Sequence, residues 1–141
     1  MAFIQMQKLE EIGQIRRKNH KLITSIFEKY SKYFILPRAT EHSDPDWFAV
    51  ALTVKDGAGF TRAEFCQFLE SNKIQTRPYF AGNIMLQPAY NGLMDKNRVI
   101  ADYPNARKVT TDTFFLGTSP VITDEQIAYI EDVVDKFFVK P

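Results

Sequence analysis

The chain has 141 residues, which suits one domain with a substantial core but is too short for two. Its 18 Lys and Arg nearly balance 17 Asp and Glu, which argues against a nucleic-acid or membrane partner held by bulk charge. The single Cys66 excludes an intramolecular disulfide and a cysteine-built metal or iron–sulfur site within this chain. No apolar run is long enough to span a bilayer, and residues 1–10 lack the layout of a signal peptide. These features predict a cytoplasmic protein.

Residues 3–30 have a helical pattern, with apolar side chains at steps of three and four residues. A single helix of this length projects beyond a small domain, because each residue rises ~1.5 Å. We therefore expect its first turns, with Phe3, Ile4 and Met6, to contact something outside this chain. Residues 31–46 contain two prolines and a polar run, and they are predicted to form a connector.

Two helix starts are predicted from capping boxes. In the first, the Thr61 side chain caps the Glu64 amide, and the Glu64 side chain accepts a hydrogen bond from the Thr61 amide. Asn72 is the expected end of this helix. In the second, Thr123 and Gln126 have the same spacing before the helix that runs to the C-terminus. Hydrophobic staple pairs flank both boxes (Phe60 with Phe65, and Ile122 with Ile127).

Three strands are predicted, at residues 47–55, 74–77 and 113–117, with a short helix at 104–110 that starts at Pro104. The order of elements indicates one α+β domain over residues 1–141. It has a small three-stranded, mainly antiparallel sheet with helices on one face, preceded by the long N-terminal helix. Residues 1–30 form the linking helix and 47–141 the sheet and helices. The other sheet face then needs cover from another polypeptide or domain.

Residues 73–90 are the most site-like stretch of the chain. A short strand ends at Pro78, an aromatic pair follows, and Gly82-Asn83 are the residue types that tolerate a positive φ most easily. Functional groups concentrate on such loops. The alternative is a strand and a turn that are aromatic-rich for ordinary packing.

Several motifs along the chain resemble the C-terminal small domain of the DegT/DnrJ/EryC1/StrS sugar aminotransferases, which have the type I fold of the pyridoxal-phosphate (PLP) enzymes. The resemblance lies in a Gln-x-x-Lys-Leu-like segment at residues 7–12, the Ile-Gln-Thr-Arg strand at 74–77, and the aromatic segment at 112–117. The Phe-Ala-Gly-Asn sequence at 80–83, followed by Gln87-Pro88, resembles the branch of nucleotide-sugar 3-dehydratases that act on 4-keto-6-deoxyhexoses in lipopolysaccharide and O-antigen synthesis.

The resemblance implies that residues 73–90 form one wall of a nucleotide-sugar cleft. The implied substrate-binding residues are Arg77, Phe80, Asn83, Gln87 and Tyr90. A guanidinium binds phosphate or carboxylate oxygens through paired hydrogen bonds, and an aromatic side chain can stack on a ring. The alternative for Arg77 is a surface ion pair.

The resemblance also implies that the cofactor, PLP or its amine form PMP, and the catalytic base belong to a large domain that precedes this region in such enzymes. We therefore expect no cofactor, no catalytic residue and no metal site in this chain alone. Neither histidine matches the family's base; we expect His20 on a helix surface or interface and His42 in a solvated loop. Cys66 is expected to be a buried, inert thiol.

The sequence thus predicts the C-terminal domain of a PLP- or PMP-dependent nucleotide-sugar dehydratase or aminotransferase, inactive alone. The nucleotide-sugar would bind only with the missing large domain, and the expected partner is a second copy of the chain or another polypeptide. The alternative is a non-catalytic dimerisation or binding module.

Overall fold

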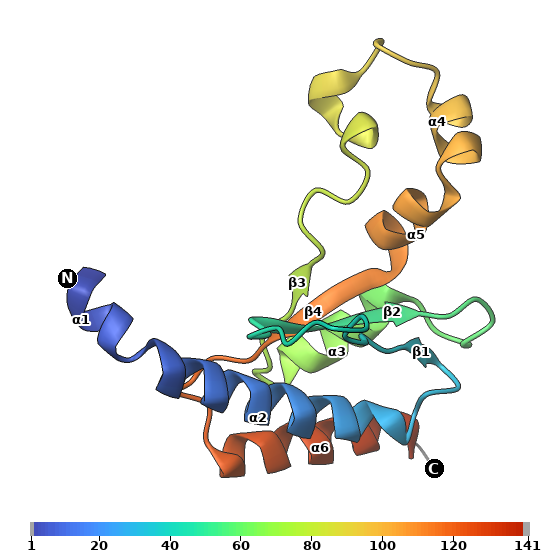
Figure 1. Cartoon of the computed structure of the whole chain (residues 1–141). Coiled ribbons are helices and arrows are strands. Elements are labelled where there is room, and N and C mark those ends of the chain that lie inside the picture. The colour runs from blue at the N-terminus through green and yellow to red at the C-terminus, as the bar shows by residue number, and fades with distance from the viewer. Residues whose placement is uncertain (1, 140–141) are drawn as a thin grey trace.

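A computed structural model describes residues 2–139 of the chain (Figure 1). Its strands form one antiparallel sheet in the order β1–β2–β4–β3. The α+β class is confirmed, with four strands instead of three, because a two-residue strand lies in the segment predicted to be a connector. The strands are β1 (Phe34–Ile35), β2 (Ala49–Val54), β3 (Arg77–Pro78) and β4 (Thr113–Gly117).

Three helices lie along one face of the sheet, and none of these three lies on the opposite face, called here the open face (Figure 1). These helices are α2 (Leu9–Glu28), α3 (Arg62–Ser71) and α6 (Asp124–Phe138). The other helices are α1 (Ala2–Gln7), α4 (Lys96–Asp102) and α5 (Pro104–Asp112), with 3-10 turns η1 (Ile84–Leu86) and η2 (Pro88–Tyr90).

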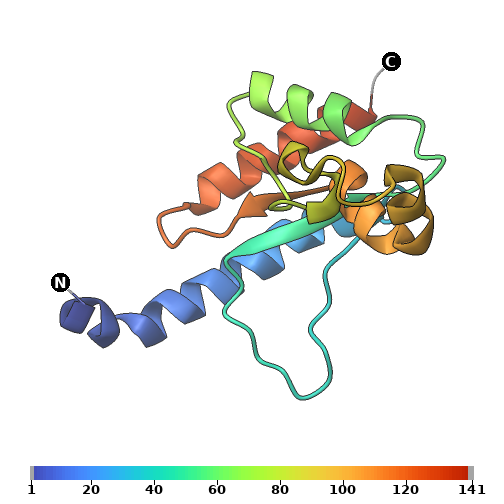
Figure 2. The same cartoon turned by 90° about the horizontal axis from the view of Figure 1, so that it is seen from above.

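The predicted N-terminal helix is interrupted once. Lys8 has φ −99° and ψ 2°, which is not helical, so α1 and α2 are separate elements and α2 ends at Glu28. α1 projects from the body (Figures 1 and 2), and its Phe3 is 74% exposed. Ile4 and Met6 are exposed as well, and the contact of these first turns with something outside the chain stays a prediction.

Every second side chain of β2 and β4 packs into the core between the sheet and the helices. Val50, Leu52 and Val54 of β2 are buried, as are Phe114 and Leu116 of β4. Successive strand residues point to opposite faces, so these five side chains point toward the helices. The Phe65 ring of α3, with no exposed surface, lies between the strands and α6. It contacts the rings of Phe27, Phe34, Phe60, Phe114, Phe137 and Phe138.

Both predicted capping boxes are confirmed. Thr61 Oγ1 accepts from the Glu64 amide at 3.2 Å, and Glu64 accepts from the Thr61 amide at 2.7 Å. The Thr61 amide and the Thr61 hydroxyl, at 2.8 Å, both donate to the Glu64 carboxylate and hold its pKa below the ordinary value. Thr123 and Gln126 make the same reciprocal pair at the start of α6. Helix α3 ends at its C-cap residue Asn72, as predicted, and the Asn72 backbone amide donates hydrogen bonds back to α3.

The strand predicted at residues 74–77 is shorter and lies further along the chain. Pairing begins at Arg77, opposite Phe115, and includes Pro78 instead of ending before it. Proline is tolerated here because β3 is at the edge of the sheet, where one side of the strand needs no partner. Ile74 and Thr76 are buried although they form no strand.

The segment between β3 and β4, residues 79–112, leaves the body and returns to it, and we call it the arm. It contains η1, η2, α4 and α5, and it rises from the sheet on the side opposite α2 and α6 (Figure 1). The helix starting at Pro104 is as predicted, whereas α4 was missed. Its N-terminus is capped by Asp95, which accepts from the Asn97 amide at 2.7 Å.

His20 is buried, which corrects the expectation of a surface position. It is 8% exposed and stacks on Trp47, with ring centroids 4.3 Å apart and planes 10° apart. The connector folds back along α2 because Arg17 binds Asp46 at 2.7 Å and Asp44 at 3.2 Å, and this places Trp47 over the imidazole. His42 is exposed, as expected. Cys66 is half-buried, and burial raises the pKa of its thiol, in agreement with an inert role.

Replacing Phe65 by Ala should destabilise the domain by about 3–5 kcal/mol, because it removes a ring from the centre of the core and leaves a cavity. Urea unfolding followed by circular dichroism measures the change. Phe3→Ala removes the same side chain from an exposed position and should shift stability by less than about 0.5 kcal/mol. Equal losses for the two variants would contradict the assigned core.

Candidate functional site

Four aromatic rings gather where the arm leaves the sheet, and we call them the aromatic cluster. Phe80 lies 6.0 Å from Phe48 and 5.8 Å from Phe115 between ring centroids, and Phe48 lies 5.4 Å from Phe115. Tyr79 joins them at 5.2 Å from Phe80. Phe115 alternates with the buried Phe114, so the cluster is on the open face. Phe80 is 66% exposed and Phe48 51% exposed, so much of this apolar surface is uncovered.

The backbone at Phe80 is unusual for a residue with a bulky side chain. Its φ is +48°, in the left-handed region that non-glycine residues rarely occupy. A turn follows, in which the Gly82 amide donates to the Tyr79 carbonyl at 3.1 Å and Gly82 has φ +59°. The positive φ angles at Phe80 and Gly82 turn the chain from β3 into the arm and leave the Phe80 ring exposed.

Gly82 and Asn83 lie directly against the other end of the arm. A Cβ at Gly82 would lie 2.7 Å from Thr110 Cα, so only glycine fits here without a shift. The Asn83 amide donates to Thr110 Oγ1 at 2.6 Å. The outgoing and returning segments of the arm are thus held together at its base.

Asn83 and Gln87 hold the shape of this loop. Asn83 is buried, and its Oδ1 accepts from the Met85 amide at 3.1 Å to cap η1. Gln87 Nε2 donates to the Ala81 carbonyl at 2.7 Å. Both side chains use polar atoms on the loop itself, and a further contact with substrate stays a prediction for each.

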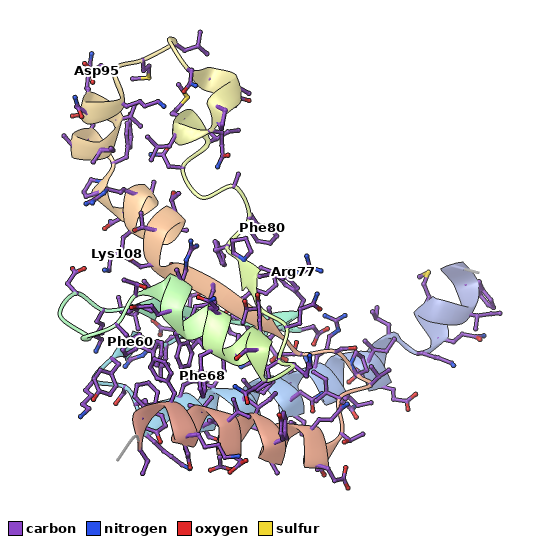
Figure 3. The ribbon with its side chains drawn as sticks, turned by 180° about the vertical axis from the view of Figure 1, so that it is seen from behind. Phe60, Phe68, Arg77, Phe80, Asp95 and Lys108 are labelled. Atoms are coloured by element: carbon purple, nitrogen blue, oxygen red, sulfur yellow. The ribbon has the colours of Figure 1, made fainter. Side chains whose placement is uncertain are left out.

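Arg77 lies exposed in β3, next to the cluster (Figure 3). The alternative for this residue was a surface ion pair, but within residues 2–139 its guanidinium has neither a salt bridge nor a hydrogen bond. Tyr90 is half-buried in η2, further along the arm. The structure therefore places Arg77 and Phe80 together, whereas Tyr90 is not part of the cluster.

The base of the arm is also tied to the body by charged side chains from α5 and α3. Lys108 binds Asp56 at 2.7 Å and Asp112 at 3.1 Å. The hydrogen bond to Asp56 raises the pKa of Lys108, and the same contact lowers the pKa of Asp56. Arg62 donates to the Thr110 carbonyl, at 3.2 Å. These contacts hold the base of the arm against the body, and Asp95 lies at the far end of the arm (Figure 3).

Sequence reasoning missed Phe48 and Phe115 as members of this surface. The signal was present in the adjacent pair Phe114-Phe115, since one member of such a pair in a strand must point away from the core. Phe48, immediately before β2, was read as part of the buried strand. Only the position of the arm, set by contacts between distant residues, shows that these rings meet.

The aromatic cluster is an exposed surface and not an enclosed cavity. A hollow of about 350 Å³ lies between residues 73–75, the end of β4 and α6, but no residue of the arm lines it. Within the described residues, no group of three His, Cys, Asp or Glu side chains is placed to hold a metal ion. No described helix is long and apolar enough to cross a membrane.

The sheet with helices on one face, and an arm bearing aromatic groups on the other, defines a small α+β domain. Comparison with known proteins identifies the protein family. Residues 1–136 match the DegT/DnrJ/EryC1/StrS aminotransferase family. The chain belongs to this family, as the sequence resemblance predicted.

Two curated relatives share more than 30% identity. The lipopolysaccharide biosynthesis protein RfbH of Salmonella typhimurium is 34% identical over 134 residues, which are 95% of this chain and 30% of RfbH. The dTDP-4-dehydro-2,6-dideoxy-D-glucose 3-dehydratase of Saccharopolyspora spinosa is 38% identical over 140 residues, 99% of this chain and 30% of that protein. The chain therefore spans about a third of the length of these relatives.

The fold is also that of solved family members. The E. coli GDP-4-keto-6-deoxy-D-mannose-3-dehydratase with bound hydrated PLP superposes with a TM-score of 0.73 at 23% identity. The match covers 93% of this chain and 33% of that one. At this identity the likeness establishes the shared fold.

Neither the capping-box helices nor the aromatic cluster provides the groups that a PLP site requires. A phosphate site at a helix N-terminus needs free backbone amides, but the N-termini of α3 and α6 are occupied by their own capping boxes. The cluster adds four rings and the Arg77 guanidinium, without the carboxylate that pairs with the pyridinium nitrogen of PLP.

Gly82→Ala should loosen the base of the arm, because the added methyl group meets Thr110 at a backbone φ that disfavours any side chain. We expect roughly 1–3 kcal/mol lower local stability, measured as faster hydrogen exchange of the Asn83 amide.

The matched control is Gly92→Ala at the tip of the arm. Gly92 also has a positive φ, +90°, but a Cβ there has nothing within 4 Å. Its substitution carries only the backbone cost of about 1 kcal/mol and should leave exchange at Asn83 unchanged. If both variants speed that exchange equally, the close approach to Thr110 is not what holds the arm.

Proposed function

We propose that this chain is the C-terminal domain of a PLP- or PMP-dependent enzyme that modifies nucleotide-linked deoxysugars. The reaction is 3-dehydration or amino transfer, in lipopolysaccharide or related deoxysugar synthesis. The cofactor and the catalytic base belong to a large domain outside these residues, so the chain alone is inactive. Two relatives support this proposal, RfbH as a lipopolysaccharide biosynthesis protein and the Saccharopolyspora spinosa protein as a 3-dehydratase. Their length also supports it, since the chain spans 30% of each.

The observation that carries the proposal is the uncovered aromatic cluster beside Arg77. Apolar rings that are half or more exposed are costly in water, and together they mark a surface that functions against a partner or a ligand. The apolar side chains of α1, including Phe3 and Met6, are exposed as well. In the proposed enzyme the large domain covers these surfaces, and a cleft forms between it and the base of the arm.

In that cleft Arg77 binds the diphosphate of the nucleotide-sugar, and Phe80 packs against a ring of the substrate. An unpaired, exposed guanidinium is available for two parallel hydrogen bonds to phosphate oxygens. Asn83 and Gln87 keep the loop in shape and contact the substrate from the arm, together with Tyr90. When bound by the large domain, the cofactor supplies the electron sink that the sugar chemistry requires.

A second candidate is a non-catalytic module that dimerises or binds a partner through the same uncovered surfaces. The exposed rings favour it to the same degree, because self-association would also cover them. Only the dimerising form of this candidate requires assembly of the isolated chain. Light scattering at high protein concentration tests that form, since a strict monomer excludes self-association.

The isolated chain should form no specific PLP adduct. Titration with PLP, followed by visible absorbance, should give only the weak, unsaturable signal that free lysine gives at the same amine concentration. A saturable band at one PLP per chain would show that the chain holds a cofactor site of its own. Co-expression with the part of the Saccharopolyspora spinosa relative outside the matched region should restore a saturable band.

In such a reconstituted enzyme, Arg77→Ala should lower kcat/KM for the nucleotide-sugar by roughly 10- to 100-fold. This range corresponds to about 1.5–3 kcal/mol for hydrogen bonds to a charged group. Steady-state kinetics measures it, with the loss mainly in KM if the guanidinium binds substrate and transition state equally. Arg38→Ala, which removes another exposed arginine from the connector, should leave both constants unchanged. A normal KM in the Arg77 variant would assign its guanidinium no role in binding.

A further inference from the structure

The contact between His20 and Trp47 joins α2 to the start of β2. The rings stack at 4.3 Å between centroids, and His20 is 92% removed from solvent, being 8% exposed. The imidazole Nε2 is buried and has no hydrogen-bond partner among the described residues. A buried polar atom without a partner is uncommon and is often tied to a functional role.

Neighbouring contacts make this a junction of three segments. On α2, Asn19 Nδ2 donates to the Ser119 carbonyl at 2.9 Å, which ties the helix to the turn after β4. Thr118 in that turn donates from its amide to the Phe48 carbonyl at 3.0 Å and from its hydroxyl to the Trp47 carbonyl. The stacked rings therefore lie against a hydrogen-bonded link between the two central strands.

Protonation of the imidazole is unfavourable at this position. Burial lowers the pKa of His20, and no charged neighbour contributes to the shift. The protonated ring also has a buried Nε2–H donor with no acceptor, which costs more than an unpaired lone pair. Attraction between a cation and the indole face opposes these costs, but it is worth about 0.5–2 kcal/mol.

The charged groups of the surrounding elements are already paired with one another. On α2, Arg17 is bound to Asp44 and Asp46 of the connector, and Lys18 is bound to Asp124 at the start of α6 at 2.7 Å. No carboxylate among these groups is left to stabilise an imidazolium.

We propose that His20 and Trp47 form a proton-sensitive latch between the N-terminal helix and the sheet. The latch holds while the imidazole is neutral, and it opens when the ring takes up a proton and leaves its buried position for water. Opening frees the segment 44–48 and weakens the link through Thr118. The inference concerns how the N-terminal helix is attached, and it does not depend on the proposed function.

The direction of the pH effect follows from the lowered pKa of His20. In the unfolded chain histidine titrates near 6.5, and in the folded chain it titrates lower. The stabilising contribution is therefore complete above pH 6.5 and is lost as the pH falls through the lower pKa of the folded state. A stacked histidine with a raised pKa would give the opposite direction.

Trp47 provides a direct readout because it is the only tryptophan of the chain. Its fluorescence should change in one sigmoidal step as the pH is lowered from 8 to 5, with a midpoint below 6.5. The step should coincide with the NMR titration of the His20 ring protons. Hydrogen exchange of the Thr118 amide, corrected for the intrinsic pH dependence, should accelerate over the same range.

Two variants isolate the imidazole. His20→Phe keeps an aromatic ring against Trp47 but cannot take up a proton, so both the fluorescence step and the acceleration at Thr118 should vanish. His42→Ala removes the exposed histidine and should leave both unchanged. The latch is overturned if the step persists in His20→Phe, or if NMR gives His20 a pKa of 6.5 or above. If His20→Phe fails to fold, the NMR titration and Thr118 exchange of the natural chain still decide the question.

Discussion

Adjacent residues of β4, Phe114 and Phe115, point to opposite faces of the sheet, and the rest of the structure depends on this division. Phe114 is fully buried and packs against Phe34 and Phe65 beneath the sheet. Phe115 instead meets Phe48 and Phe80 on the open face. The first set of rings stabilises the domain by removing apolar surface from water. The second set keeps much of its surface in water, and that exposure makes it a candidate for function.

Elements defined by local sequence were predictable. A capping box links residues three positions apart, so Thr61 and Glu64, or Thr123 and Gln126, reveal a helix start without any knowledge of the fold. The apolar strand around Val50 and the segment 113–117 were equally clear from their side chains. The class of fold followed from the order of these elements.

Features set by distant contacts were not predictable in the same way. The burial of His20 depends on Trp47, which reaches it only because Arg17 holds the connector along α2. The shortened β3 depends on its register with β4, and a two-residue strand such as β1 has no periodicity to detect. The sequence singled out Arg77 and Phe80, but Phe48 and Phe115 join them only through the fold.

The latch and the aromatic cluster meet at consecutive residues. The Trp47 ring lies against α2, whereas the Phe48 ring belongs to the cluster on the open face. Thr118 donates to both of their carbonyls, so the backbone at these two residues is held to the turn after β4. A change in how α2 is attached would reach the wall of the proposed cleft through this backbone link. In the longer enzyme that we propose, the attachment of the N-terminal helix and the shape of that wall would then be coupled through the start of β2.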